Sequence, residues 1–321
     1  MEDTRSRLAL TPEGEAFVDE WFDPKPYVVA HTSGSTGKPK EIRLLKSDMR
    51  ASARGTNRFF NITAESLLLL PLSPEYIAGK MQIVRALEAG CRLIGELPSN
   101  RPFTGFESHA TMVPIVPSQV ESLLESGLYG RVDNMIIGGA PIPQSLENKI
   151  VAVGATAYAT YGMTETCSHV ALRRLGETLY RGLPGFRFCA DDRGCLVIES
   201  DVMSFGRLVT NDVVEIADSQ SFRWLGRFDN IINSGGVKIN PEEIEKLLMP
   251  LIPNCSNLYV TSRQSQKWGQ EAVIVTDFPR LDMETVHPVL QNIPKIKWPK
   301  AIVYQERLKF TPTGKIVREK F

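Results

Sequence analysis

Residues 31–40 form a run of hydroxyl-bearing residues, glycines and lysines that directly follows the apolar stretch at residues 26–30. The apolar stretch predicts a short β-strand, so the run is a loop at its carboxyl end. Glycines permit positive φ angles, hydroxyls and backbone N–H groups can donate to phosphate oxygens, and lysines add positive charge. The loop therefore predicts a site for the phosphates of ATP, with contacts from Thr32, Ser33, Gly34, Ser35, Thr36, Gly37 and Lys38.

The spacing of the loop glycines disfavours a P-loop of the Walker A type. That motif has four residues between its first glycine and its Gly-Lys pair, whereas two residues separate Gly34 from Gly37. A flexible Ser/Gly linker is the alternative. Linkers seldom join a strand to two nearby lysines and a helical stretch, and we expect a helix to follow this loop.

Composition limits the class of protein. A chain of 321 residues with 42% hydrophobic content fits about two domains with buried cores. The 37 basic residues balance the 37 acidic ones, so no net charge favours nucleic acid or an anionic membrane. The longest apolar run, residues 67–70, is too short to span a bilayer, and the amino terminus has no apolar signal core, so we expect a cytoplasmic location. Five cysteines without a CxxC pair and four scattered histidines predict reduced thiols and no zinc site.

Short β-rich runs alternate with helical ones from Tyr27 to about Trp224, which predicts an α/β fold built on a sheet. The glycine turn at residues 138–141 follows one strand-like run. The polar turn at residues 161–166 follows the next. Open sheets bind ligands at the carboxyl ends of their strands, so we expect these turns and the phosphate loop to meet at one site.

The character of the sequence changes around Gly226. A glycine pair, Gly235 and Gly236, is followed by a predicted helix with Pro241 in its first turn. We therefore expect a large α/β core domain at residues 1–228 and a small α+β lid domain at residues 229–321. The second domain ends in a tight turn that carries Lys315.

Six segments resemble, in order, the motifs of the adenylate-forming superfamily, which contains acyl-CoA synthetases, luciferases and peptide-synthetase adenylation domains. They are residues 31–40, 138–141, 161–166, 210–212, 226–229 and 312–315. The resemblance implies a truncated adenylate-forming core with a mobile C-terminal lid. It also implies two reaction steps: an acid and MgATP give an acyl-adenylate and pyrophosphate, and CoA then displaces AMP.

The resemblance implies roles for residues of the nucleotide site. Glu165 would hold Mg²⁺ and Thr164 would contact the α-phosphate, because hard cations and phosphates favour such oxygen groups. Asp212 would accept hydrogen bonds from the ribose, with Arg227 beside it. Taken alone, each would be a solvated turn residue or part of a surface ion pair. Further nucleotide contacts would come from Gly138, Gly139, Ala140, Pro141, Tyr161, Gly162 and Met163.

The C-terminal domain would serve both steps. Lys315 would bring positive charge to the α-phosphate as the carboxylate attacks, although by itself it resembles any exposed lysine. The domain would then rotate about a hinge at Asp229. Gly235 and Gly236 would let the pantetheine arm of CoA pass close to the backbone. No side-chain nucleophile is required, and Cys167 is expected to be a wall residue.

Two stretches, residues 71–87 and 113–119, resemble the o-succinylbenzoate–CoA ligase family of menaquinone biosynthesis. Arg85 is a single cation in an apolar, helix-like stretch and suits the second carboxylate of a dicarboxylic acid. A structural partner or solvent is the alternative for this side chain. Tyr76, also expected at the acid, stands where that family has histidine, and Asn211 replaces a common glycine.

The phosphate loop begins near residue 31, whereas the superfamily has a long amino-terminal subdomain before it. Contacts with a second copy are expected to cover surface that this subdomain would bury. A CoA or carrier-protein ligase for another aryl or fatty acid is one alternative function. A nucleotide-binding relative without catalysis is another, against which the retained Lys38, Glu165 and Lys315 argue.

Overall fold

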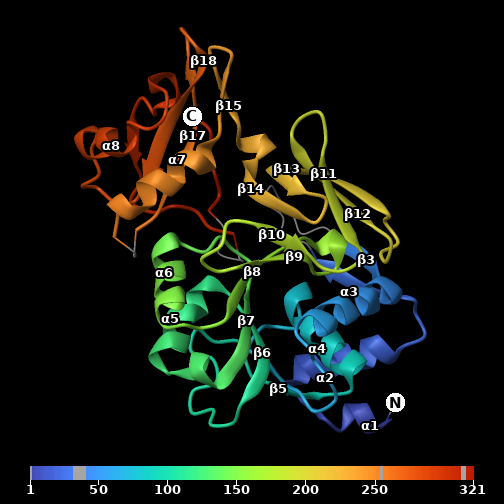
Figure 1. Ribbon diagram of the computed structural model, residues 1–321. Helices are drawn as coiled ribbons and strands as arrows, with labels where there is room; N and C mark the ends of the chain where they lie inside the picture. Colours follow the sequence, from blue (N-terminus) through green and yellow to red (C-terminus); the bar gives the residue numbers. More distant parts are fainter. Residues whose placement is uncertain (1, 32–40, 254–255, 312–315) are drawn as a thin grey trace.

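The computed structural model describes residues 2–31, 41–253, 256–311 and 316–321 (Figure 1). Most strands form one long mixed sheet, in the order β1-β5-β4-β6-β7-β8-β9-β10-β14-β13-β12-β11. The strands from β1 to β8 in this order are parallel, and those from β9 onward are antiparallel. The parallel strands are β1 (Leu8–Ala9), β4 (Leu67–Leu70), β5 (Arg92–Gly95), β6 (Ala110–Ile115), β7 (Val132–Ile137) and β8 (Ala157–Gly162). The antiparallel strands are β9 (His169–Arg174), β10 (Tyr180–Gly182), β11 (Phe186–Ala190), β12 (Cys195–Ser200), β13 (Arg207–Asp218) and β14 (Ser221–Arg227).

Helices cover both faces of the parallel half of the sheet (Figure 1). One group is α2 (Pro12–Phe22), α3 (Lys46–Phe59) and α4 (Ile77–Ala89); the other is α5 (Pro117–Glu125) and α6 (Gln144–Ala152). Every residue of β4 is buried, and its side chains alternate between two hydrophobic clusters: Leu68 and Leu70 join one, Leu67 and Leu69 the other. The expected α/β fold is therefore confirmed, but the expected alternation with helices stops at β8, because β9 to β14 follow one another without an α-helix.

The strand before the phosphate loop is confirmed, but its place in the fold differs from the expectation. β2 (Tyr27–His31) pairs with β3 (Glu41–Leu45) in a separate antiparallel hairpin. A strand, and not a helix, therefore comes first after residues 32–40, and α3 begins only at Lys46. The reason is a two-residue period in β3, where Leu44 is buried and its neighbours are exposed. Residues 32–40 themselves lie outside the described part of the chain.

A second sheet begins at Ile232 and has its own hydrophobic cluster. Its strands are β15 (Ile232–Ser234), β16 (Val237–Ile239), β17 (Leu258–Ser265), β18 (Gly269–Thr276) and β19 (Ile302–Tyr304), with helices α7 (Pro241–Leu248) and α8 (Met283–Val289) beside them. This part occupies the upper left of Figure 1. The division at residue 228 stays a prediction.

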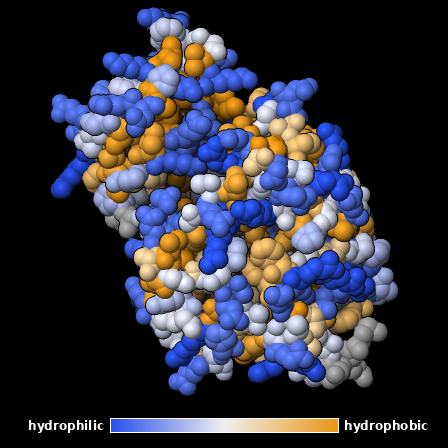
Figure 2. Space-filling view, viewed as in Figure 1, coloured by the Kyte–Doolittle hydropathy of each residue, from blue (hydrophilic) through white to orange (hydrophobic). Residues whose placement is uncertain are grey.

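The remaining helical elements of the described residues are short: α1 (Glu2–Arg5), η1 (Leu128–Arg131), η2 (Thr164–Thr166), η3 (Phe228–Asn230), η4 (Met249–Leu251) and η5 (Lys295–Lys297). Apolar side chains appear on the visible face in small groups among hydrophilic ones (Figure 2). Within the described residues, no helix is long and apolar enough to cross a membrane.

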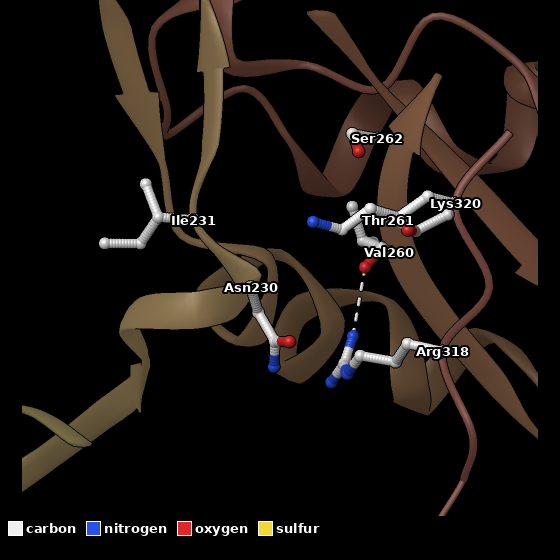
Figure 3. A pocket seen from close by; sticks show the side chains of 7 residues that line it. All are labelled: Asn230, Ile231, Val260, Thr261, Ser262, Arg318 and Lys320. Carbon is white, nitrogen blue, oxygen red and sulfur yellow. Dashed lines mark hydrogen bonds between the residues drawn. The ribbon is translucent and has the colours of Figure 1, made fainter. Parts of the chain in front are cut away.

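The last segment, residues 316–321, is joined to the second sheet by a half-buried arginine (Figure 3). The guanidinium of Arg318 makes a two-point ion pair with Glu245, in which Nη2 lies 2.7 Å from Oε2. It also donates to the backbone oxygen of Val260 at 3.0 Å and lies 3.6 Å from Glu242. The cavity beside it measures about 60 Å³ and is too small for an organic substrate.

Candidate active site

The two predicted turns lie side by side because β7 and β8 are parallel neighbours. Each strand delivers its turn at the carboxyl end. Gly138 is required at the first turn, since a Cβ there would lie 2.4 Å from Oγ1 of Thr160 on β8. Gly139 has a φ of 84°, which glycine adopts without strain. The structure therefore brings together residues 138–141 and 161–166, as the sequence predicts.

Hydrogen bonds within the second turn leave its catalytic candidates at the surface. The backbone N–H of Met163 donates to Oγ1 of Thr166 at 3.0 Å, and the Thr166 hydroxyl donates to the backbone oxygen of Ser168 at 2.7 Å. Glu165 is exposed and Thr164 is half-buried on η2. The turn is thus held by Thr166, whereas the neighbouring Thr164 and Glu165 have no side-chain hydrogen bond or ion pair to the other described residues.

Asp212 on β13 gathers several donors. Its Oδ2 accepts from the Tyr161 hydroxyl at 2.7 Å, and its Oδ1 accepts from Nε1 of Trp224 at 3.1 Å. Arg227, its partner across to β14, lies 3.6 Å away. Tyr161 is buried, and burial together with the charge of Asp212 raises its pKa. The structure therefore places Tyr161 beneath the turn, directed at Asp212 and at the ring of Phe222.

The predicted hinge residue is connected to this group. Arg227 donates to Oδ2 of Asp229 at 3.0 Å, and the side-chain amide of Asn211 lies 3.3 Å from the same oxygen. Arg193, which the sequence did not single out, places its guanidinium 5.2 Å above the ring of Phe228. The ribose candidates and the hinge candidate thus share one charged cluster.

The predicted CoA-binding glycines lie in the second sheet. Gly235 and Gly236 form the turn between β15 and β16, with φ of 57° and 82°. A Cβ at Gly235 would lie 2.6 Å from the Trp268 ring, so glycine is needed for that contact. This hairpin points away from the large sheet in Figure 1. Lys315 lies outside the described residues.

Arg85 lies on α4 and contacts Ser168, the residue directly before β9. Only 2% of Arg85 is exposed. Nη2 donates to Oγ of Ser168 at 2.6 Å and Nη1 donates to Oε1 of Gln82 at 3.2 Å, whereas Nε has no hydrogen-bond partner among the described residues. Burial lowers its pKa to about 9. Tyr76 precedes the first turn of the same helix and is 45% exposed.

No carboxylate of the described chain forms an ion pair with Arg85. Its neighbours are neutral: Gln82, Ser168, and beyond Ser168 the buried side chains of His169 and Thr56. The sequence analysis missed the last three. Ser168 and His169 directly follow the predicted turn, and this proximity was the available signal. Cys167 is buried, and burial raises its pKa to about 12, as fits a wall residue.

A family model described as "AMP-binding enzyme" matches residues 4–222. The chain belongs to this family. A curated relative, the 2-succinylbenzoate–CoA ligase of Enterococcus faecalis, is 27% identical over 91% of this chain and 68% of its own length. An indoleacetate–CoA ligase of Aromatoleum aromaticum is 26% identical over 92% of this chain and 66% of its own. The crystal structure of an AMP-forming acyl-CoA synthetase/AMP-acid ligase II-like protein from Dyadobacter fermentans is 33% identical, has a TM-score of 0.65, and covers 95% of this chain and 91% of that one.

These similarities confirm the expected superfamily and the expected kind of enzyme, an AMP-binding enzyme whose relatives are AMP-forming acid–CoA ligases. The two curated relatives are named for different acids, although their identities to this chain are almost equal. This chain spans about two thirds of their length. Overall similarity therefore leaves the choice of acid to the residues of the site.

Proposed function

We propose that this protein is an ATP-dependent, AMP-forming acid–CoA ligase whose acid carries a second carboxylate, and that the acid is o-succinylbenzoate. One carboxylate attacks the α-phosphate of ATP and releases pyrophosphate. The CoA thiolate then displaces AMP to give o-succinylbenzoyl-CoA. The observation that carries the choice of acid is the buried guanidinium of Arg85 without a carboxylate partner.

A buried cation without a counter-ion is costly, because it loses its hydration without gaining an opposite charge. The neutral partners of Arg85 replace part of that hydration, but its Nε–H has no hydrogen-bond partner in the described part of the chain. A substrate carboxylate supplies both the charge and the acceptor. Ser168, which is only half-buried, gives this group an accessible end next to the second turn. A short diacid held there presents its other carboxylate to Thr164 and Glu165.

Positioning and charge neutralisation carry the chemistry. Glu165 suits Mg²⁺, which usually binds proteins through one or two carboxylates together with substrate phosphates and water. The described residues contain no cluster of three metal-ligating side chains. Mg²⁺ would neutralise the phosphates of ATP. Thr164, the loop hydroxyls and Lys38 bind the phosphates, and Asp212 with Arg227 binds the ribose.

The C-terminal part acts in both steps. Lys315 supplies positive charge during adenylation, and Gly235 and Gly236 accommodate CoA afterwards. The change between these two arrangements occurs at Asp229, whose contacts to Arg227 and Asn211 would break when the hinge turns. The cytoplasmic location, the absence of nucleic-acid partners and the association with a second copy stay predictions.

The first test is product detection by mass spectrometry. The protein is mixed with MgATP, CoA and o-succinylbenzoate, with benzoate, indoleacetate and a medium-chain fatty acid as parallel substrates. Thioester from o-succinylbenzoate, and little from the three monoacids, is expected. Preferential use of a monoacid contradicts the dicarboxylate assignment and keeps the ligase. Neither adenylate nor thioester from any acid contradicts the ligase itself.

Separating the two steps tests Lys315. The Lys315→Ala variant is expected to lose pyrophosphate release from acid and MgATP, because the charge that assists attack is gone. It should still convert supplied acyl-adenylate and CoA to thioester, since that step does not use this lysine. An equal loss of both steps contradicts the assigned role.

A further inference from the structure

A buried histidine next to Arg85 has no part in the reaction described so far. His169 is the first residue of β9 and is 5% exposed. Its Nδ1 lies 3.3 Å from Oγ of Ser168, and its Nε2 lies 3.0 Å from Oγ1 of Thr56 on α3. Ser168 in turn accepts from Arg85 at 2.6 Å. Four side chains from two helices and one strand segment thus form a continuous hydrogen-bonded chain.

The contact of Thr56 with the backbone determines which group donates and which accepts in each of these hydrogen bonds. Oγ1 of Thr56 lies 3.2 Å from the backbone oxygen of Ser52, which can only accept, so the Thr56 hydroxyl donates there. Thr56 must therefore accept from Nε2–H of His169, which leaves Nδ1 without a proton. The hydroxyl of Ser168 donates to Nδ1. Oγ of Ser168 is then free to accept from Arg85, as its 2.6 Å distance requires.

These donor and acceptor roles determine which N–H groups and how much charge Arg85 presents to a ligand. Ser168 and Gln82 hold one N–H of each Nη group, so the plane of the guanidinium is fixed. The Nε–H has no hydrogen-bond partner among the residues that the structure describes. Burial and the charge of Arg85 hold the pKa of His169 well below its usual range, so the imidazole is neutral. The group therefore carries one positive charge, which matches one carboxylate.

We propose that His169 and Thr56 are positioning residues that hold Arg85, through Ser168, in the orientation that selects an acid with a second carboxylate. This inference rests on the proposed function. It assigns acid selection to two residues on β9 and α3 whose side chains act through Ser168 and Arg85; the backbone of His169 also pairs with Gly162. Arg85 alone would bind a carboxylate; the hydrogen-bonded chain fixes where that carboxylate must lie.

Thr56→Val tests the proposal because it keeps the shape of the side chain and removes its hydroxyl. Nε2–H then has no acceptor, so the ring is expected to carry its proton on Nδ1 and to donate it to Ser168. The Ser168 proton must then turn away from Nδ1, and its contact with Arg85 is disturbed. The measured quantity is kcat/KM for o-succinylbenzoate divided by kcat/KM for 4-oxo-4-phenylbutanoate, which lacks the ring carboxylate.

We expect this ratio to fall about tenfold in Thr56→Val, the scale of one hydrogen bond to a charged group, with KM for ATP unchanged. Ser52→Ala is the matched control. Ser52 lies one turn earlier on α3 and is 3% exposed, and its hydroxyl has no hydrogen-bond partner among the described residues. The ratio should stay at the wild-type value in this variant.

Arg85→Gln separates failure of this inference from failure of the proposed function. If Arg85→Gln lowers the ratio and Thr56→Val does not, the acid assignment stands and the positioning role falls. If Arg85→Gln keeps the wild-type ratio, both fall. The ¹⁵N chemical shifts of the His169 ring in the wild-type protein give an independent readout. They should report a proton on Nε2, and a proton on Nδ1 would overturn the inference without any variant.

Discussion

Two arginines, the buried Arg85 on α4 and the half-buried Arg318 in the C-terminal segment, are held in opposite ways. Arg318 lies between the carboxylates of Glu245 and Glu242, and its pairing joins residues distant in the sequence. Burial alone would lower its pKa, and the bonds and charges of Glu245 and Glu242 raise it above the usual value. Arg85 is more deeply buried, has neutral partners only, and its pKa falls to about 9.

The difference distinguishes an arginine that stabilises the fold, Arg318, from an arginine that the fold positions for a ligand, Arg85. Around Arg318 two carboxylates and a backbone oxygen satisfy the guanidinium within the chain. Around Arg85 the described chain supplies acceptors but no charge. If this distinction is correct, removal of each arginine should affect a different property of the protein.

The largest effect on stability is expected at Arg318. Arg318→Met should lower the free energy of unfolding of the C-terminal part by about 3 kcal/mol, because the buried Glu242 and the half-buried Glu245 lose their counter-ion. Urea denaturation followed by circular dichroism measures this change. The ratio of diacid to monoacid use should stay unchanged. A loss of stability below about 1 kcal/mol would show that the ion pair is not what holds the segment.

Arg85 should show the reverse. Arg85→Gln is expected to lower kcat/KM for o-succinylbenzoate about 30-fold, near 2 kcal/mol, because a charged hydrogen bond to the acid is lost. The free energy of unfolding should stay level or rise, since a buried unpaired charge has been removed. Steady-state kinetics and urea denaturation on the same preparation measure both. A large loss of stability with unchanged acid use would make Arg85 a structural residue like Arg318.

The parts of this comparison that the sequence could predict are local. Arg85 is recognisable as a lone cation in an apolar helical pattern. The glycine turn at residues 138–141 and the polar turn at residues 161–166 likewise indicate where β7 and β8 end. Period and turn chemistry are carried by neighbouring residues, so they can be recognised without a structure. Arg318 and Glu245 carry no such signal, because 73 residues separate them.

What the sequence could not predict depends on contacts between distant residues. Residues 26–30 were correctly predicted as a strand, but only the pairing of β2 with β3 shows that it belongs to a hairpin and not to the large sheet. The nucleotide contact of Tyr161, predicted from its place in a motif, stays a prediction. The burial of Tyr161 against Phe222 and its bond to Asp212 depend on β13 and β14, which come much later in the chain.

The two regions should also differ in their response to pH. The pKa of His169, beside Arg85, is held well below its usual range by burial and by the charge of Arg85. In the unfolded chain His169 has its ordinary pKa near 6.5. Below that pH the unfolded chain therefore binds a proton at His169 that the folded chain does not bind. Stability should fall as the pH drops below about 6.5, by about 1.4 kcal/mol per unit from this residue.

Unfolding in urea at pH 7, 6 and 5 measures this slope, and His169→Gln supplies the control. The variant lacks the titrating ring, so its stability should change less over this range than that of the wild type. Equal slopes would mean that His169 is protonated in the folded protein. The neutral surroundings inferred for Arg85 would then be wrong, and the contrast with the ion-paired Arg318 would disappear.

The smallest effect is expected where an ion pair has ideal geometry but no burial. Arg187 on β11 contacts Asp201 at two points, 2.7 and 2.9 Å, much as Arg318 contacts Glu245, but both side chains are about half exposed. Water and salt screen such a pair. Arg187→Ala should therefore leave the urea midpoint unchanged within error. A loss as large as that of Arg318→Met would show that two-point geometry, and not burial, distinguishes the arginines that stabilise this fold.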